Sequence, residues 1–476
     1  MTIDILPDDA LLEIFDWYLG GDEDDLKVDA WYPLVHVSRR WRNIIFSSPR
    51  RLNLRLFYTA KPGEPASEVL GVWPSLPIII QVNASRPWSV PNVIAALEHK
   101  YRIRRIQLVD IAATELRVIL QEMRGSFPAL EDLFLTSSIE EPQLSQIIPD
   151  SFLGSIAPRL RSLTLVSIPF QGLPNLISST TNGLVELSLL KIPRRWGYIR
   201  PKTMATVLST LTKLETLSIE FGLNPRRGWK TRPPSQLTRF VLPSLKSCRF
   251  QGICGYLECF LARIDAPRLE NLDITLCKYE NYPFPLEEIP QFNQFIGRTK
   301  MFNALNNASI YLGSDNLEIT LSRTPWAHDA KLTLKIMCRY KIRILARLCI
   351  TKFLPLSNIE RLGISSEYHK WQPDREASAE DIQWVLSLAR FPAVKILYLS
   401  KEIVPSVACG LKEVTEGRLI PVLRSLQKIS TLMPLPPGSV KAEIDRYAAS
   451  RGLSVPRHPT TPFCWAAANK QVADDL

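Results

Sequence analysis

The first fifty residues contain more apolar positions than a small helical bundle can bury. A helix is predicted from about Pro7, because proline suits the first helical turn and the acidic residues after it complement the partial positive charge there. Its apolar residues follow the spacing i, i+3, i+4, i+7, and neighbouring apolar residues widen that stripe. A second helical stretch is predicted over residues 31–49. Because small domains bury a low fraction of their surface, part of this apolar area must be buried by something other than the helices themselves.

A second pattern, with apolar residues at positions 0, +3 and +5, recurs through the rest of the chain. It appears at Ile103, Ile106 and Leu108, and from Leu130 its first residues are separated by 30, 24, 30, 31 and 24 residues. The later triplets begin at Leu160, Leu184, Leu214, Leu245, Leu269, Ile359 and Val394. Proline stands two residues before five of the triplets, where it ends a helix and favours extended backbone. The period predicts a solenoid in which each repeat adds one strand to a shared core.

The predicted fold class is therefore α/β, with a helical domain over residues 1–56 and an irregular β/α solenoid over residues 57–433. The repeat resembles leucine-rich repeats, although the asparagine that usually follows the strand is absent, and the unequal steps predict a bent, uneven horseshoe. Between Leu269 and Ile359 the phase lapses for 90 residues, room for about three repeats of roughly 30 residues. The alternating runs at residues 317–321 and 331–336 are assigned to the same sheet.

The C-terminal region, residues 434–476, reads as a proline-rich linker, a short capping helix and a disordered tail. Before it, helices are predicted over residues 414–419 and 422–429. The last helix is predicted to have Ser439 as its N-cap and Gly452 at its end, and to close the open end of the solenoid. Disorder is expected beyond about Pro456.

Three features near the amino terminus follow one another in a particular order: Leu6-Pro7, Ile14-Phe15, and residues 37–42 with the sequence Val-Ser-Arg-Arg-Trp-Arg. Over residues 3–54 they resemble an F-box, the helical module that docks a substrate receptor on the Skp adaptor of a cullin-based (SCF-type) ubiquitin ligase. Asp9 stands where that family usually has glutamate, and an acidic insert at residues 20–25 lengthens a link between helices. Neither departure removes an apolar anchor.

The resemblance implies a three-helix domain with an apolar surface for the adaptor. The residues that it places at or near this surface are Leu6, Pro7, Leu11, Ile14, Val35, Val37 and Ser38. It places Phe15, Leu34, Trp41 and Ile44 between the helices. The alternative is that all of these residues form the core of a helical cap on a larger domain. Burying one such side chain contributes roughly 1.5–3 kcal/mol, so five or six could offset an association cost of about 4–15 kcal/mol.

Charge and cysteine content indicate the cellular compartment in which the protein works. The chain carries a formal net charge of +11, but residues 1–26 contribute −9 with nine acidic residues and no basic one, so the remainder carries +20. The eight cysteines include no Cys-x-x-Cys pair, which favours reduced thiols and a reducing compartment. No signal peptide or membrane-spanning run is evident. A cytoplasmic or nuclear protein, or one present in both compartments, is expected.

Enzymatic chemistry has no local signature in the sequence. The five histidines lack metal-ligand spacing, and no nucleophile elbow, phosphate-binding loop or zinc-protease motif occurs, so neither a catalytic site nor a cofactor nor a metal is expected. Function is expected instead on the sheet face turned away from the solenoid core. The candidates for substrate binding there are Asp132, Phe134, Glu186, Ser188, Glu220, Arg249 and Asp273. Their mixed, weakly acidic character favours a protein partner, unless this face is simply solvated or covered by the C-terminal tail.

Two basic loops follow neighbouring repeats and form a separate candidate anion-binding patch. The residues proposed for it are Arg194, Arg195, Trp196, Arg226, Arg227 and Trp229. Arginine binds anions and tryptophan stacks on flat groups, so the patch suits an acidic or phosphorylated segment or a nucleic acid. The alternative is two unrelated solvated loops.

The function predicted from the sequence is that of a non-enzymatic receptor that docks on the Skp adaptor and cullin scaffold and holds a client protein for ubiquitin transfer. Catalysis would come from proximity, because a tethered lysine meets the conjugating enzyme at high effective concentration. One alternative is a nucleic-acid-binding solenoid, which the basic body permits but the sheet face disfavours. Another is an F-box-docked assembly factor that takes no part in ubiquitin transfer. No membrane partner is expected.

Overall fold

The computed structural model describes most of the chain and divides it into two compact units, residues 1–199 and 200–476. The described residues are 5–19, 31–73, 75–138, 148, 152–155, 157–168, 183–193, 199–222, 238–277, 290–324, 331–337, 356–367, 388, 391–417, 423–431 and 438–455. Each unit is a mixed α/β structure built on parallel strands.

The first unit begins with three helices, α1 (Asp8–Leu19), α2 (Trp31–Val37) and α3 (Arg39–Ser47). The prediction of one continuous helix over residues 31–49 was therefore wrong, because Ser38 interrupts it. Ser38 has extended backbone angles (φ −154°, ψ 162°) and its side chain accepts a hydrogen bond from the amide of Trp41. A serine in this position satisfies a donor that the start of α3 would otherwise leave unpaired, which favours a new helix over continuation of the old one.

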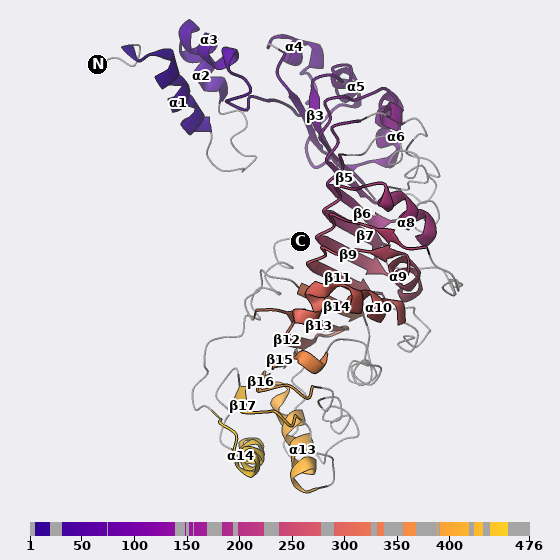
Figure 1. The fold of residues 1–476 in the computed structure, drawn as a ribbon. Helices are drawn as coiled ribbons and strands as arrows, with labels where there is room; N and C mark the ends of the chain where they lie inside the picture. Colours follow the sequence, from indigo (N-terminus) through magenta and orange to yellow (C-terminus); the bar gives the residue numbers. More distant parts are fainter. Residues whose placement is uncertain are drawn as a thin grey trace. The chain divides into compact units, whose positions relative to one another are not determined.

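The rest of the first unit is a parallel sheet whose strands follow one another in chain order. The strands are β1 (Leu56–Tyr58), β2 (Ile78–Asn83), β3 (Ile103–Ile111), β4 (Asp132–Ser137), β5 (Ser162–Val166) and β6 (Glu186–Ile192). Helices α4 (Ala66–Gly71), α5 (Val90–Leu97) and α6 (Ala113–Glu122) lie along one side of these strands, and a short 3-10 turn, η3 (Phe152–Ser155), follows β4 (Figure 1). This arrangement is a solenoid with one strand per repeat.

The predicted phase of the repeat is confirmed by the register of the strands. Leu133 pairs with Leu163, which pairs with Leu187, and the three side chains are at most 1% exposed. The +5 positions form a second buried column in the same register, from Leu135 through Leu165 to Leu189. These stacked leucines fill the space between the sheet and the helices, so each repeat completes the core of its neighbour.

Several strands of the first unit end with a residue in the left-handed backbone region. Asp110 (φ 55°), Ser167 (φ 59°) and Lys191 (φ 49°) each stand two residues after a +5 leucine. The next side chains, Ile111, Ile168 and Ile192, are buried at the sequence position where leucine-rich repeats usually carry asparagine. A non-glycine residue with positive φ destabilises the folded state by roughly 1–2 kcal/mol, and burial of an isoleucine stabilises it by about 1.5–3 kcal/mol. Buried isoleucines therefore occupy the asparagine position after β3, β5 and β6, whereas Ser138 occupies it after β4.

The second unit continues with parallel strands and with helices on one side of them (Figure 1). In spatial order its strands are β7 (Thr216–Phe221), β9 (Ser247–Gly252), β11 (Asn271–Leu276), β14 (Lys331–Met337), β13 (Asn316–Ser322), β12 (Asn307–Leu312), β15 (Arg361–Ser366), β16 (Ile396–Leu399) and β17 (Lys428–Thr431). Two short strands, β8 (Phe240–Val241) and β10 (Ile264–Asp265), pair separately. The helical elements are α8 (Pro201–Ser209), α9 (Cys254–Leu261), α10 (Pro290–Arg298), η5 (Lys300–Ala304), η6 (Leu356–Asn358), α13 (Val404–Thr415) and α14 (Ser439–Arg451).

The region where the sequence repeat lapses is a three-stranded reversal within this sheet. After β11 the chain passes through α10 and η5 to β12, and β13 and β14 then fill the positions between β12 and β11. β13 is antiparallel to both of its neighbours, whereas β12 and β14 are parallel to the flanking strands β15 and β11. The assignment of residues 317–321 and 331–336 to the sheet is confirmed, but the three strands described there, β12 to β14, are not three successive parallel repeats.

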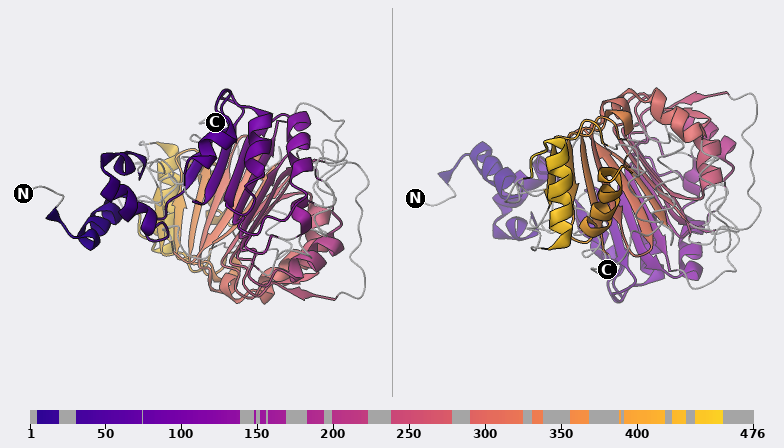
Figure 2. Two further views of the ribbon diagram at one scale, coloured as in Figure 1. Left: turned by 90° about the horizontal axis from the view of Figure 1, so that it is seen from above. Right: turned by 90° about the horizontal axis from the view of Figure 1, so that it is seen from below.

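The C-terminal described residues close the second unit. Helix α14 packs against α13 and buries Ile444, Tyr447 and Ala448, and the two helices lie side by side in Figure 2. The predicted end at Gly452 is confirmed by its left-handed φ of 63°, but Gly438 precedes the helix and Ser439 is its first residue, so the N-cap prediction was wrong. The helix predicted over residues 422–429 is also wrong, because strand β17 begins at Lys428. The predicted disordered tail beyond Pro456 lies outside the described residues.

Candidate docking surface

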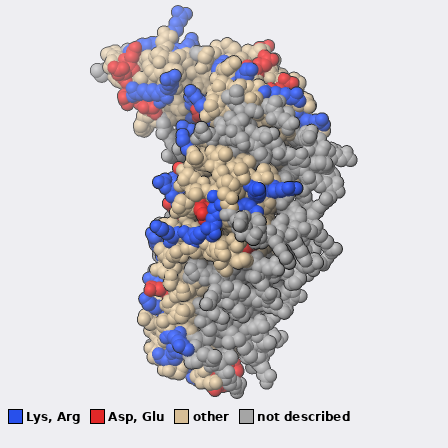
Figure 3. Space-filling view, turned by 45° about the vertical axis from the view of Figure 1, so that its right-hand side comes forward, with Lys and Arg blue, Asp and Glu red and all other residues tan. Residues whose placement is uncertain are grey.

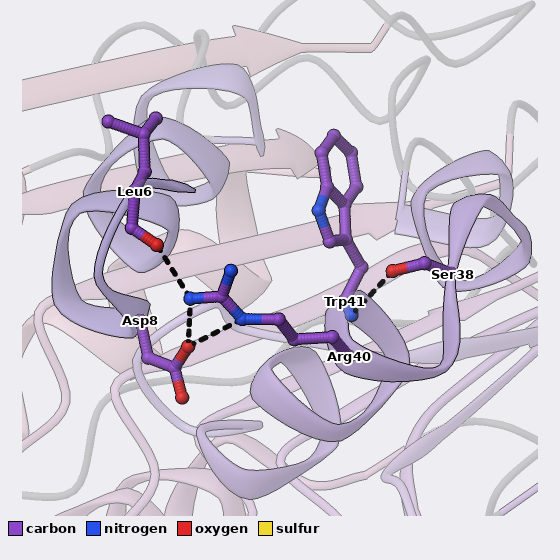
Figure 4. Close-up of polar contacts among 5 residues, drawn as sticks. All are labelled: Leu6, Asp8, Ser38, Arg40 and Trp41. Carbon is purple, nitrogen blue, oxygen red and sulfur yellow. Dashed lines mark hydrogen bonds and ion pairs between the residues drawn. The ribbon is translucent and has the colours of Figure 1, made fainter. Parts of the chain in front are cut away.

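The Val-Ser-Arg-Arg-Trp-Arg run holds the three N-terminal helices together. Arg40 donates from Nε (2.9 Å) and Nη2 (2.6 Å) to Oδ1 of Asp8, and Nη2 also donates to the carbonyl oxygen of Leu6 at 2.6 Å (Figure 4). Arg42 donates from Nε to the carbonyl oxygen of Val35 at 3.0 Å, near the end of α2. These contacts fix the start of α1 against α3 and satisfy a carbonyl at a helix end, so the basic residues of the motif have structural roles.

The interior of this helical domain contains two of the residues that the resemblance had placed toward the adaptor. Leu11 and Val35 are 0% exposed, so they contribute to the core and cannot touch a partner directly. Phe15 and Trp41 pack ring against ring, with centroids 4.8 Å apart, and Ile44 is also buried. The prediction that these three residues lie between the helices is confirmed, whereas Leu34, the fourth residue placed there, is only half-buried. Ser38 is corrected to the N-cap of α3, where its side-chain oxygen is already engaged.

An apolar ridge remains exposed on the same domain. We define the ridge as Ile14 (41% exposed), Trp17 (84%) and Tyr18 (48%) on α1. Val37 (59%) is exposed at the end of α2, Pro7 is exposed, and Leu6 is half-buried. Of the ten large hydrophobic side chains that are exposed among the described residues, six belong to residues 5–37, the others there being Ile5 and Tyr32. A concentration of this kind marks an interaction surface rather than ordinary scattered exposure.

A different flank of the helical domain faces the first repeats. On α1, Glu13 and Asp16 form ion pairs with Arg51 in the segment that leads to β1. On α2, Tyr32 and His36 contact the ring of Trp73, with centroids 5.4 and 6.1 Å away. Successive residues of a helix are about 100° apart around its axis, so the ridge lies about a third of a turn from the acidic pair. A partner on the ridge therefore approaches a side of α1 that the ion pairs with Arg51 do not use.

Charged side chains surround this surface with both signs. Figure 3 shows Asp and Glu gathered with Lys and Arg at the upper left of the view, where the helical domain lies. Asp8 and Glu13 remain largely exposed despite their arginine partners, and exposed ion pairs of this type contribute little because water and salt screen them. The apolar ridge is therefore the part of this surface that offers the most binding free energy.

Removal of the Ser38 hydroxyl should destabilise the helical domain without altering the ridge. For Ser38→Ala we expect the free energy of unfolding of this domain to fall by about 1 kcal/mol, because the N-cap acceptor for the Trp41 amide is lost. Ser38→Asp should restore most of that stability, since aspartate is also a good N-cap. Thermal unfolding followed by tryptophan fluorescence measures the effect. Equal losses in both variants would show that the side-chain oxygen does not cap α3.

The candidate substrate-binding residues lie on the sheet face opposite the helices, and several of them pair with one another or with neighbours. In the first unit Asp132 accepts an ion-pair contact from Nε of Arg105 at 3.1 Å, and Ser188 is 7% exposed. Phe134 is half-buried and Glu186 is exposed. In the second unit Arg249 donates from Nε to Asp273 at 3.2 Å, and Gln251 donates from Nε2 to Glu220 at 3.3 Å. The geometry places them on one face of the strands in each unit.

The six residues of the candidate anion-binding patch fall outside the described residues. They are Arg194, Arg195, Trp196, Arg226, Arg227 and Trp229. Within the described part of the chain, no group of three or more His, Cys, Asp or Glu side chains is arranged to hold a metal ion, and no helix is long and apolar enough to cross a membrane.

The sequence alone did not identify two residues to which the structure draws attention. Trp17 stands outside the motif and was therefore not predicted as a binding residue. Its position three residues after Ile14 does place the two side chains next to each other on the surface of the helix. Glu258 of α9 is a buried carboxylate that bonds to another helix, and no local pattern in the sequence indicates it.

No protein-family profile matches the sequence, and no curated protein matches it significantly. Among solved structures the chain is similar to the leucine-rich repeat-containing protein LegL7 from Legionella pneumophila, with 11% sequence identity and a TM-score of 0.29 over 85% of this chain and 100% of that one. A TM-score this low does not establish a shared fold, so the architecture described here rests on this chain's own strands and registers.

Proposed function

We propose that this chain is the substrate-recognition subunit of a cullin-based, SCF-type ubiquitin ligase, with an F-box at residues 1–56 and an irregular leucine-rich-repeat-like horseshoe after it. The F-box docks on the Skp adaptor, which connects it to the cullin scaffold, and the repeats hold a client protein. The chain itself supplies no catalytic residue in this role. The observation that carries the proposal is the exposed ridge of Ile14, Trp17 and Tyr18 on a small helical domain whose core is already complete without it.

The energetics of the ridge are adequate for docking. Full burial of one large apolar side chain contributes roughly 1.5–3 kcal/mol, and Ile14, Trp17, Tyr18, Val37 and Pro7 are all available to a partner. Their sum is comparable with an association cost of about 4–15 kcal/mol. Leu11 and Val35 contribute indirectly, because they set the spacing of the helices that carry these side chains.

The separation of the two flanks suits a receptor that binds two proteins at once. Tyr32 and His36 of α2 contact Trp73 in the first repeats, and Glu13 and Asp16 of α1 pair with Arg51, while the ridge makes none of these contacts. In this proposal the adaptor binds the ridge and the client binds a sheet face, so the two partners use different surfaces of the chain. The open sheet faces have paired charges and small hydroxyl side chains, which favour a protein client over a nucleic-acid backbone. In this role the chain works in the cytoplasm, the nucleus or both.

Co-expression with the Skp adaptor tests the docking step. We expect co-purification of the wild-type chain with the adaptor and loss of it in the double variant Leu6→Asp, Pro7→Ala, with an unchanged melting temperature of the repeats. A wild-type chain that does not co-purify, or a double variant that binds normally, would refute docking. Ubiquitination of co-purifying proteins in a reconstituted ligase then separates a substrate receptor from an assembly factor that only shares the docking step.

A further inference from the structure

The open face of the first unit changes from acidic to apolar along its strands. This face is opposite the helices α4 to α6, and its side chains alternate with the buried leucines of the repeat (Figure 1). At the start of β6 Glu186 is exposed, and four residues later Leu190 is half-buried on the same face. Residues four apart in a strand are separated by about 13 Å. An acidic end and an apolar end of the face are therefore about 13 Å apart.

The apolar end extends across three strands. Leu190 of β6 pairs in register with Val166 of β5. Phe134 of β4 pairs with Thr164, so it is the diagonal neighbour of Val166 on the same face. Adjacent strands are about 4.8 Å apart, which brings the three apolar side chains within reach of one another. All three are half-buried rather than enclosed, so they offer apolar area to a partner.

Apolar side chains at this repeat position distinguish the first unit from the second. Val166 and Leu190 stand six residues after the first leucine of their triplets. The same position carries Glu220, Gln251 and Thr275 in β7, β9 and β11. Sheet faces turned to water normally carry polar side chains, as these three strands do. A group of neighbouring apolar side chains on such a face indicates an interaction surface.

Small hydroxyl side chains separate the acidic end from the apolar end. Thr164 and Ser188 pair with each other in the middle of the face and are 9% and 7% exposed. Ser188 is the open-face residue of β6 between Glu186 and Leu190. A chain that lies along β5 and β6 therefore meets no charged or bulky side chain of these strands between the two ends.

The carboxylate of Glu186 is available to a cation. Ser162 donates to it from Oγ at 3.4 Å, and no lysine or arginine among the described residues forms an ion pair with it. Asp132, the other acidic residue at this level of the face, is already paired with Nε of Arg105 at 3.1 Å. Glu186 therefore attracts a basic side chain and repels phosphate, which disfavours a nucleic acid here.

We propose that an extended segment of a client protein binds to a recognition strip made of Phe134, Thr164, Val166, Glu186, Ser188 and Leu190. The segment carries one basic residue and one large apolar residue four positions apart, because such residues of an extended chain lie about 13 Å apart on one side. The basic residue pairs with Glu186, and the apolar residue packs on Val166 and Leu190. Calling the bound protein a client rests on the proposed function, but recognition of the segment does not require the adaptor.

A peptide array tests the spacing with the purified full-length chain and without the adaptor. Each peptide consists of serine and threonine apart from one arginine and one leucine, which are one to seven positions apart in either order. We expect retention to be highest at a separation of four positions, and to fall about tenfold when glutamate replaces the arginine. Equal retention at every separation, or no retention of any peptide, would overturn the proposal.

Glu186→Lys should exchange the preference of the strip. This variant should lose the arginine peptides and retain the peptides that carry glutamate instead. Glu122→Lys is the matched control, because Glu122 is exposed at the end of α6 on the helical side and the change in net charge is the same. We expect its preference to match the wild type. An unchanged preference in Glu186→Lys, or an exchange in Glu122→Lys, would show that the strip does not select the peptide.

Val166→Thr tests the apolar end with little change of shape. We expect it to weaken binding of the best peptide about fivefold in fluorescence anisotropy, since a hydroxyl replaces a methyl group at the contact. Val118→Thr is its control, because Val118 is 45% exposed on α6, and it should bind as the wild type does. Equal effects of the two substitutions would contradict the assignment.

A second copy of the chain is the other candidate occupant of the strip. If light scattering shows a dimer that Glu186→Lys or Val166→Thr dissociates, the strip is a contact between copies and the proposal fails. A chain that selects the peptides but does not bind the Skp adaptor would refute the docking step alone. A chain that binds the adaptor but shows no peptide selection would refute the recognition strip alone.

Discussion

Trp17→Ala should weaken binding to the Skp adaptor by about 100-fold, while the unfolding of the chain stays the same. Trp17 is 84% exposed, so its removal takes little from the folded state. A tryptophan at the centre of an interface typically contributes at least 2 kcal/mol, and a loss of about 2.7 kcal/mol corresponds to this change in Kd. Calorimetric titration of the purified adaptor into wild-type and variant protein measures it.

Tyr101→Ala provides the matched control for Trp17. Tyr101 is also a large aromatic side chain with high exposure, 71%, but it lies in the repeat region between α5 and β3. We expect its substitution to leave the adaptor Kd unchanged. Equal effects of the two substitutions, or no effect of Trp17→Ala on an adaptor that does bind, would mean that the ridge is not the docking surface.

The core of the repeats could be predicted because its signal is local and repeated. The spacing 0, +3, +5 fixes both the strand and the inward direction of its side chains, and Leu133, Leu163 and Leu187 occupy matching positions in three successive strands. Each further copy of the pattern adds support to the same register. Proline before the triplets marks the turn that precedes the strand, so the phase is set independently of the leucines.

The secondary-structure prediction failed where a short apolar run is compatible with both a helix and a strand. Leu423, Leu426 and Ile429 are three residues apart, which fits one face of a helix, yet Ile429 lies in β17 and pairs with Leu397 of β16. The reversal at β12 to β14 could not be foreseen for a different reason. The order of neighbouring strands depends on long-range pairing, and alternation within one strand does not state which strand lies beside it.

The docking surface was predictable as a region but not residue by residue. A motif states which residues occur together, but whether a side chain faces the core or a partner depends on how the helices pack. Leu11 and Val35 are enclosed because α1 and α3 meet at Phe15 and Trp41, while Trp17 is left outside this contact. The contact between Glu258 and α10 joins residues 33 and 34 positions apart, so no local pattern could reveal it.

Substitution of two adjacent residues in β9 should give very different stabilities. Phe250 is 2% exposed, stacks on Tyr256 with centroids 5.9 Å apart and contacts Phe221, whereas the side chain of Arg249 is 67% exposed on the opposite face. Phe250→Ala should lower the free energy of unfolding of the second unit by about 3–5 kcal/mol, because it removes buried apolar contacts and leaves a cavity.

Arg249→Ala should cost less than about 1 kcal/mol, because it removes only an exposed ion pair with Asp273. Urea denaturation of both variants measures the difference, and similar losses would contradict the assignment of the two faces. The comparison also separates stability from client binding. Arg249 lies on the face proposed for the client, so Arg249→Ala can reduce client binding in a protein that is still folded, whereas loss of binding in Phe250→Ala would follow from unfolding of the sheet that presents this face.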